Sequence, residues 1–269
     1  MDNAFPHPDE SAADHVGIAT NNRWSWFRRR RNVAIVAASA AAILALAGWL
    51  LSSDHDSDAS HVSPPPTAAA QFAAQLADLQ ASAAEAVTID GYVIDDAMLR
   101  RLTSLDHLKV IQVETTSISE DTAARLAAMP KLEQLHLRGV AINDAVLTQI
   151  ATSPTIWLLN LPNAEVSPEA IENLATMPAL RQLRLGIQTG DNRHGRAVST
   201  LTRLRSVHLI GVYVTDEVLQ LLAKMPQLES LYLDDTAVTE AGWTWLFQNS
   251  PHLHVHINQK HHDRDPHIH

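Results

Sequence analysis

Residues 129–144 read MPKLEQLHLRGVAIND, and residues 225–240 read MPQLESLYLDDTAVTE. The two stretches begin 96 residues apart, which is four times 24, and both place leucines in an L-x-x-L-x-L arrangement. Similarity that returns at a fixed interval indicates a chain built from internal repeats, each of which stacks on the next. The period indicated by this pair of stretches is 24 residues.

A pair of apolar residues separated by one polar residue recurs at this period in eight copies. The pairs are Val87/Ile89, Ile111/Val113, Leu135/Leu137, Leu159/Leu161, Leu183/Leu185, Val207/Leu209, Leu231/Leu233 and Val255/Ile257. Alternation of apolar and polar residues predicts a short strand with one buried side. The residues between the members of each pair then form one outward row: Thr88, Gln112, His136, Asn160, Arg184, His208, Tyr232 and His256.

A helix-start signal follows seven of the strands at the same period. Residues that favour the N-cap position recur at Asp95, Ser119, Asn143, Ser167, Asp191, Thr215 and Thr239. Such side chains accept a hydrogen bond from a free backbone N–H at the beginning of a helix. Acidic residues follow in most of the first turns, where they complement the helix dipole. Each copy is therefore predicted to hold a short strand, a turn and a short helix.

The pattern resembles the leucine-rich repeat family of the bacterial type over residues 82–258. The matching residues include Leu132, Leu135, Leu137 and Ile142 in one copy, and Leu228, Leu231, Leu233 and Val238 in another. The resemblance implies an α/β fold, a right-handed solenoid with a parallel sheet on its concave side and helices on its convex side. The position that is usually Asn or Cys differs here, so the asparagine ladder of receptor-type members is missing: Tyr92, Thr116, Val140, Ala164, Gln188, Val212 and Thr236.

An apolar segment near the N-terminus predicts a membrane anchor. Residues 33–51 carry no charge, and at about 1.5 Å per residue their helix would match the roughly 30 Å core of a bilayer. Arg28–Arg31 precede the segment and acids follow it, which predicts a single-pass protein with a cytoplasmic N-terminus and periplasmic or extracellular repeats. The alternatives are a signal peptide cleaved at the A-x-A site of Ala45 and Ala47, or a buried helix of a soluble protein.

The protein then divides into five expected parts. They are a cytoplasmic tail (1–32), a transmembrane helix (33–51), a linker (52–70), the leucine-rich repeat domain (71–258) and a His-rich tail (259–269). Residues 71–86 place apolar side chains at helical spacing and are expected to form a helix that caps the first strand.

The composition restricts the function. Hydrophobic residues make up 46% of the chain and charged residues 19%, which is enough to bury a core. The chain has no cysteine, which excludes disulfides and thiolate chemistry, and its net charge of −10 argues against nucleic acid as a partner. The sequence contains no G-x-S-x-G, H-E-x-x-H or phosphate-binding glycine-rich motif. We therefore expect no enzyme and no cofactor.

Eight residues of the middle repeats form the candidate binding site: Trp157, Leu158, Asn160, Arg181, Arg184, Arg205, His208 and Tyr232. Trp157, Arg181 and Arg205 belong to a second row, which is expected to point outward at the strand starts. The members of this second outward row are Glu85, Lys109, Glu133, Trp157, Arg181, Arg205, Glu229 and Leu253. Aromatic and Arg side chains dominate binding hot spots. The expected partner is a protein or another envelope component, and the arginines would favour an acidic one. In the alternative, Trp157 covers its own sheet edge and the arginines are solvated.

Two further features leave other functions open. His254 and His256 lie on one side of a strand and are weak candidate ligands for zinc or copper, but no tight ligand spacing supports them, so no metal is assigned. The fifth copy, with Gly186, Gly190 and Gly195, indicates either a specialised loop or decay of the repeat, and decay is favoured. The alternative functions are a structural spacer without a ligand and a metal- or pH-responsive sensor.

Overall fold

The computed structural model of the protein describes residues 66–258 together with 260 and 261. The expected cytoplasmic tail (1–32) and transmembrane helix (33–51) lie outside the described residues, as do most of the linker and of the His-rich tail. Within the described part, no helix combines the length and the apolar character that crossing a bilayer requires.

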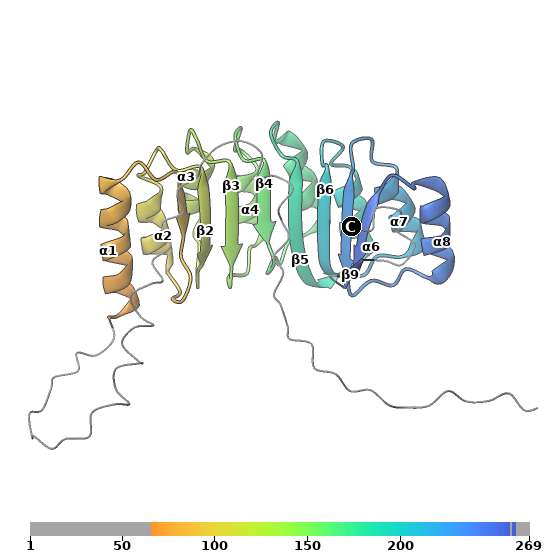
Figure 1. The fold of residues 1–269 in the computed structure, drawn as a ribbon, viewed down its shortest axis with the longest axis horizontal. Helices are drawn as coiled ribbons and strands as arrows, with labels where there is room; N and C mark the ends of the chain where they lie inside the picture. The colour runs from red at the N-terminus through yellow and green to blue at the C-terminus, as the bar shows by residue number, and fades with distance from the viewer. Residues whose placement is uncertain (1–65, 259, 262–269) are drawn as a thin grey trace, which may run out of the picture. The chain divides into compact units, whose positions relative to one another are not determined.

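The described residues form a nine-stranded sheet whose strands follow the order of the sequence (Figure 1). The strands are β1 (Ala86–Thr88), β2 (Val110–Glu114), β3 (Gln134–Arg138), β4 (Leu158–Leu161), β5 (Gln182–Gly190), β6 (Ser206–Val212), β7 (Ser230–Asp234), β8 (His254–Ile257) and β9 (Lys260–His261). β1 to β8 pair in parallel with their successive neighbours, which confirms the expected sheet. The short β9 pairs with β8 in the antiparallel direction and was not expected from the repeat.

One helix precedes the first strand, and the others follow the parallel strands in turn. They are α1 (Ala68–Ala81), α2 (Asp96–Leu102), α3 (Glu120–Ala127), α4 (Asp144–Ile150), α5 (Pro168–Glu172), the 3₁₀ helix η2 (Asn173–Thr176), α6 (Asn192–Ser199), α7 (Asp216–Ala223) and α8 (Glu240–Asn249). Figure 1 shows the connecting helices behind the strands, with α1 at one end of the row. This arrangement of parallel strands and short connecting helices is an α/β fold of the leucine-rich repeat type.

The core lies between the sheet and the helices, and the repeat period sets it. Paired residues on neighbouring strands are 24 positions apart, as in Ile111 beside Leu135 and Leu135 beside Leu159. These three side chains are 0% exposed. Because each strand buries alternate residues, the residues between them lie on the opposite side of the sheet, which we call the open face.

The N-cap signals act largely as predicted. Six of the seven side chains accept a hydrogen bond from a backbone N–H in the first turn, namely those of Asp95, Ser119, Asn143, Ser167, Asp191 and Thr239. The seventh, Thr215, makes no cap bond, and its hydroxyl donates to Asn192 Oδ1 at 3.2 Å instead.

The acids of the first turns have a second role that the dipole argument did not predict. Asp96 Oδ1 accepts the Ser119 N–H of the next repeat at 2.7 Å. Asp216 Oδ1 accepts the Thr239 N–H in the same way at 2.8 Å. These bonds therefore join one repeat to the next on the helix side.

The N-terminal helix α1 begins three residues before the expected cap helix and ends at Ala81. It buries Phe72, Leu76 and Leu79, and the Gln75 side chain donates to the Thr88 carbonyl oxygen at 3.0 Å. The helix therefore covers β1, where the parallel sheet begins.

The fifth repeat keeps the 24-residue period but has a longer strand, and its helix is not lost as decay of the repeat would suggest. Its strand β5 runs for nine residues, with a shift in register to β6 between Gly186 and Gly190. Its helix α6 forms, and a capping box of Asp191 and His194 closes the first turn. A Cβ on Gly195 would lie 2.5 Å from Val218 Cγ1, so this glycine permits the close approach of α6 to α7.

One residue of the second outward row was placed wrongly. Leu253 is 1% exposed, and its N–H donates to the Ser250 carbonyl oxygen. Leu228 makes the same kind of bond to Met225 in the preceding repeat. The two leucines are 25 residues apart, so the core position has moved by one residue after α8, the longest of the helices after α1.

Candidate functional site

Four of the eight candidate residues lie side by side on the open face. The register pairs Asn160 of β4 with Arg184 of β5, Arg184 with His208 of β6, and His208 with Tyr232 of β7. All four residues are partly buried, with the His208 side chain only 12% exposed; the helices cover only the other side of the sheet. The row is therefore accessible to a partner from the open side.

Three other candidates also meet, at the strand starts. The Arg181 N–H donates to the Trp157 carbonyl oxygen at 2.9 Å, and the Arg205 N–H donates to that of Arg181 at 2.8 Å. Leu158 follows Trp157 and pairs with Gln182 across β4 and β5. The fold thus brings these residues together as the repeat period predicted.

The side chains at the strand starts are less free than the sequence suggested. The Trp157 indole N–H donates to Glu133 Oε2 at 3.4 Å, and Arg205 pairs with Glu229. The Arg181 guanidinium donates to the carbonyl oxygens of Pro178 and Leu180, at 2.9 and 2.8 Å. Of these two arginines, Arg205 is paired with an acid, whereas Arg181 keeps its charge but has donors engaged within the protein.

Arg184 is the exception. Within the described residues its side chain forms no hydrogen bond or ion pair, and its Nε atom is buried without a partner. Burial lowers the pKa of Arg184, the neighbouring Arg138 charge acts in the same direction, and Asp234 opposes both. An arginine remains charged under such conditions. The middle of the open face therefore holds a partly desolvated cation with an unsatisfied donor.

A pair that sequence reasoning missed stands next to Arg184. His208 Nε2 lies 2.9 Å from Asp234 Oδ2, and the two side chains are only 12% and 9% exposed. Burial lowers the pKa of His208, although the hydrogen bond to Asp234 raises it and Arg184 lowers it further. Asp234 is bonded to this histidine and forms no ion pair with Arg184. In the sequence, the position of Asp234 directly after the Leu231–Leu233 pair was the only indication that it could belong to the site.

On the other side of Arg184, Asn160 contacts a histidine. Asn160 Nδ2 lies 3.1 Å from His136 Nδ1, and Asn160 Oδ1 is buried without a partner. Burial, with Arg138 and Arg184 close by, lowers the pKa of His136 to about 4. His136 is therefore neutral at pH 7. Arg138 itself pairs with Asp90 at 2.9 Å, while its Nε atom is buried and unpaired.

Aromatic rings continue the row beyond His208. The Tyr232 ring centroid lies 5.5 Å from that of His208 and 4.6 Å from that of His256, with which it stacks. Stacked rings of this kind form a rigid surface with apolar faces and polar edges. The row thus changes from polar at Asn160 to aromatic at Tyr232 and His256.

The two weak metal candidates do meet. His256 Nε2 and His254 Nε2 are 2.8 Å apart, at hydrogen-bonding distance. Among the residues that the structure describes, no group of three or more His, Cys, Asp or Glu side chains could hold a metal ion. The pair by itself is short of the ligand number that structural zinc sites use.

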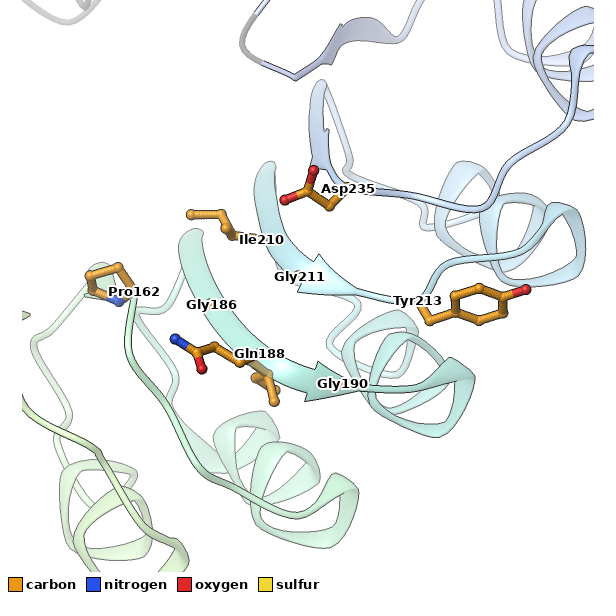
Figure 2. Close-up of a pocket in the computed structure, with 9 residues that line it drawn as sticks. Pro162, Gly186, Gln188, Gly190, Ile210, Gly211, Tyr213 and Asp235 are labelled. Carbon is orange, nitrogen blue, oxygen red and sulfur yellow. The ribbon is translucent and has the colours of Figure 1, made fainter.

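A hollow of about 520 Å³ adjoins the row where β5 and β6 are lengthened. Its lining residues are Pro162, Gly186, Ile187, Gln188, Gly190, Ile210, Gly211, Tyr213 and Asp235. Figure 2 shows Pro162 at one end of the hollow and Tyr213 at the other. A Cβ on Gly186 would lie 2.1 Å from the Pro162 carbonyl oxygen, so backbone approach accounts for this glycine. The hollow extends the open face from Arg184 towards the strand ends.

Comparison with known proteins adds little beyond the fold. No protein-family model matches the chain, and no curated protein matches it. Among solved structures, an internalin (InlF) from Listeria monocytogenes str. 4b F2365 is similar, with 16% sequence identity and a TM-score of 0.48. The match covers 67% of this chain and 49% of that one, so the protein spans about half the length of the internalin. The repeat register, not this similarity, defines the protein as one with a leucine-rich-repeat-type fold.

Proposed function

We propose that the protein is an interaction module that binds a protein of the cell envelope through the open face of β4 to β7. Arg184 carries the proposal, because a partly desolvated cation without a partner is costly unless a ligand completes it. Tyr232 and Leu158 would supply the apolar contact area on either side of it. Aromatic and Arg side chains of this kind are the usual anchors of protein interfaces.

Binding fits the face better than catalysis does. The His208–Asp234 pair is an arrangement that hydrolases use to orient a general base. In the described part of the protein, however, the other ring nitrogen of His208 has no hydroxyl or other nucleophile as a hydrogen-bond partner. The pair therefore orients a neutral imidazole on a surface, which suits recognition.

The proposal extends to location. Residues 33–51 would anchor the protein in a membrane, with residues 1–32 in the cytoplasm and the repeats on the other side. The support is the charge pattern around the apolar segment.

Alkaline carbonate extraction of membranes, followed by protease treatment of right-side-out vesicles, tests this membrane anchor. The anchor predicts a protein that resists extraction and a repeat domain that the protease reaches. Release of the whole protein by carbonate would contradict it.

Site-specific photo-crosslinking tests the binding face. A benzophenone amino acid at Tyr232 is compared with one at Glu172, which is exposed on α5. Discrete adducts from position 232 and none from position 172, formed in intact cells, are expected. Equal adducts from both positions, or none from either, would favour a spacer without a discrete ligand. The spacer alternative is supported by Arg205 and Lys109, because both form ion pairs within the protein.

A further inference from the structure

In the part of the chain that the structure describes, the guanidinium of Arg184 lacks both a hydrogen-bond acceptor and an acidic partner. Its Nε is buried and unpaired, and no carboxylate within the described residues lies within ion-pair distance of it. The nearest acid by electrostatic effect is Asp234, which is bonded to His208 instead. A planar guanidinium presents Nε–H and Nη–H in a fork whose spacing matches the two oxygens of one carboxylate.

We propose that Arg184 binds a single carboxylate of the partner, held by its Nε–H and Nη–H donors and by the side-chain amide of Asn160. This inference rests on the proposed function, because it names the chemical group that the open face would recognise. The carboxylate could belong to an Asp or Glu side chain or to the C-terminus of the partner protein, and the shared chemistry is the planar monoanion. The occupant is thus an acidic segment of a protein.

Asn160 can serve as a donor because its neighbour is neutral. In the present arrangement, Asn160 directs Nδ2 towards His136 Nδ1 and leaves Oδ1 buried and unpaired. A neutral imidazole can carry its proton on either ring nitrogen. With the proton on Nδ1, His136 would donate to Asn160 Oδ1, and a turn of the amide by 180° would direct its NH₂ group towards the bound carboxylate.

The charges around Arg184 favour a monoanion over a more highly charged ligand. Asp234 lies on β7, two strands from Arg184, and Asp90 pairs with Arg138 at 2.9 Å. Asp234 would repel a phosphate dianion more strongly than a carboxylate, and the Asp90 pair leaves Arg138 with little charge to offset that repulsion. A cationic group is disfavoured too, because the unpaired Arg184 guanidinium would repel it.

The test follows the arginine side-chain N–H directly. Residues 1–269, labelled with ¹⁵N-arginine and solubilised in a non-ionic detergent, are titrated while the Nε–Hε resonance of Arg184 is recorded. Three small probes are used: N-acetylglutamate N-methylamide for a side-chain carboxylate, N-acetylalanine for a terminal one, and N-acetylglutamine N-methylamide as the uncharged control. A saturable shift of the Arg184 signal with either carboxylate, at least five times larger than with the glutamine probe, is expected.

Matched variants make the result specific. The variant Arg184→Lys keeps the charge but loses the fork and is expected to weaken binding at least fivefold, observed on uniformly ¹⁵N-labelled protein through the backbone N–H signals of His208 and Asn160. The control Arg193→Lys, on α6 and paired with Glu169, is expected to leave it unchanged. An Arg184 signal that does not move, or that moves equally with the glutamine probe, would overturn the inference. The crosslinking experiment at position 232 does not depend on carboxylate recognition. Discrete adducts there would therefore keep the proposed function even if Arg184 binds no carboxylate.

Discussion

The two sides of the same strands follow different rules. On the helix side, neighbouring strands carry the same kind of residue, as with Leu135, Leu159 and Leu183, all at most 2% exposed. On the open face, the residues between them change from His136 to Asn160 to Arg184. The helix side must fill a core of fixed dimensions in every repeat. The open face has no such constraint, so its residues can differ from repeat to repeat without disturbing the core.

The largest expected effect comes from breaking the helix side. Leu135→Ala removes a fully buried side chain and should lower the free energy of unfolding by about 2–5 kcal/mol, because it leaves a cavity. The matched open-face change Gln112→Ala should stay within about 0.5 kcal/mol, as surface substitutions usually do. Urea denaturation followed by circular dichroism measures both. Similar losses for the two variants would remove the distinction between the two sides.

The open face should show its own dependence on pH through His136. The pKa of this histidine is lowered to about 4 in the folded protein, whereas an unfolded histidine has a pKa of about 6.5. The unfolded state therefore binds more protons between these values, and stability should fall as the pH drops from about 6.5 to about 4. The loss attributable to His136 is about 1–3 kcal/mol.

The variant His136→Gln isolates this contribution, because it keeps a polar side chain without the titration. The difference in unfolding free energy between the variant and the parent protein should change over that pH range and level off below it. A constant difference from pH 7 to pH 4 would show that His136 takes up its proton equally in both states.

A smaller effect is expected where the repeats join on the helix side. Ser119 caps α3, and its own N–H donates to Asp96 of the preceding repeat. Ser119→Ala should cost about 1 kcal/mol, because the cap bond is lost, while Ser119→Gly should cost only a few tenths, because glycine is itself favoured over alanine at the N-cap position. Thermal denaturation of the pair provides the comparison. A Ser119→Ala variant as stable as the parent protein would mean that the side-chain cap contributes nothing.

The smallest effect, with the opposite sign, is expected at Arg184. Arg184→Met keeps much of the length of the side chain and removes a buried donor that has no partner. We expect the unfolding free energy to rise by about 0.5–1 kcal/mol, because the desolvation cost of that donor disappears. The same urea titration measures it, and Arg193→Met is the control. A clear loss of stability would indicate that Arg184 contributes to the fold.

The sequence predicted the helix side well, and the reason is physical. Burial acts on every repeat alike, so residues such as Leu135 and Leu209 reveal their strands by position alone, and N-caps such as Ser119 mark where helices begin. The exceptions arise where the period changes, as at Leu253, where a longer helix moves the core position by one residue. β9 lies outside the repeat and so could not be inferred from it.

The candidate site was predicted only in part. The register of Asn160, Arg184, His208 and Tyr232 follows from the period. The partners of their side chains do not, because long polar side chains can pair with several neighbours at similar energy. Arg181 and Arg205 therefore looked free in the sequence, although each is engaged within the protein. Asp234 could be recognised as part of the site only once its distance to His208 was known.

The most direct test measures stability and binding in one variant. Once crosslinking has identified the partner, its dissociation constant is determined for the parent protein and for Tyr232→Ala, together with the unfolding free energy of each. Loss of an interface anchor should raise the dissociation constant at least about tenfold, while loss of ring stacking should lower the unfolding free energy by no more than about 1.5 kcal/mol. An unchanged dissociation constant beside a large loss of stability would contradict the account, since the open face would then serve the fold.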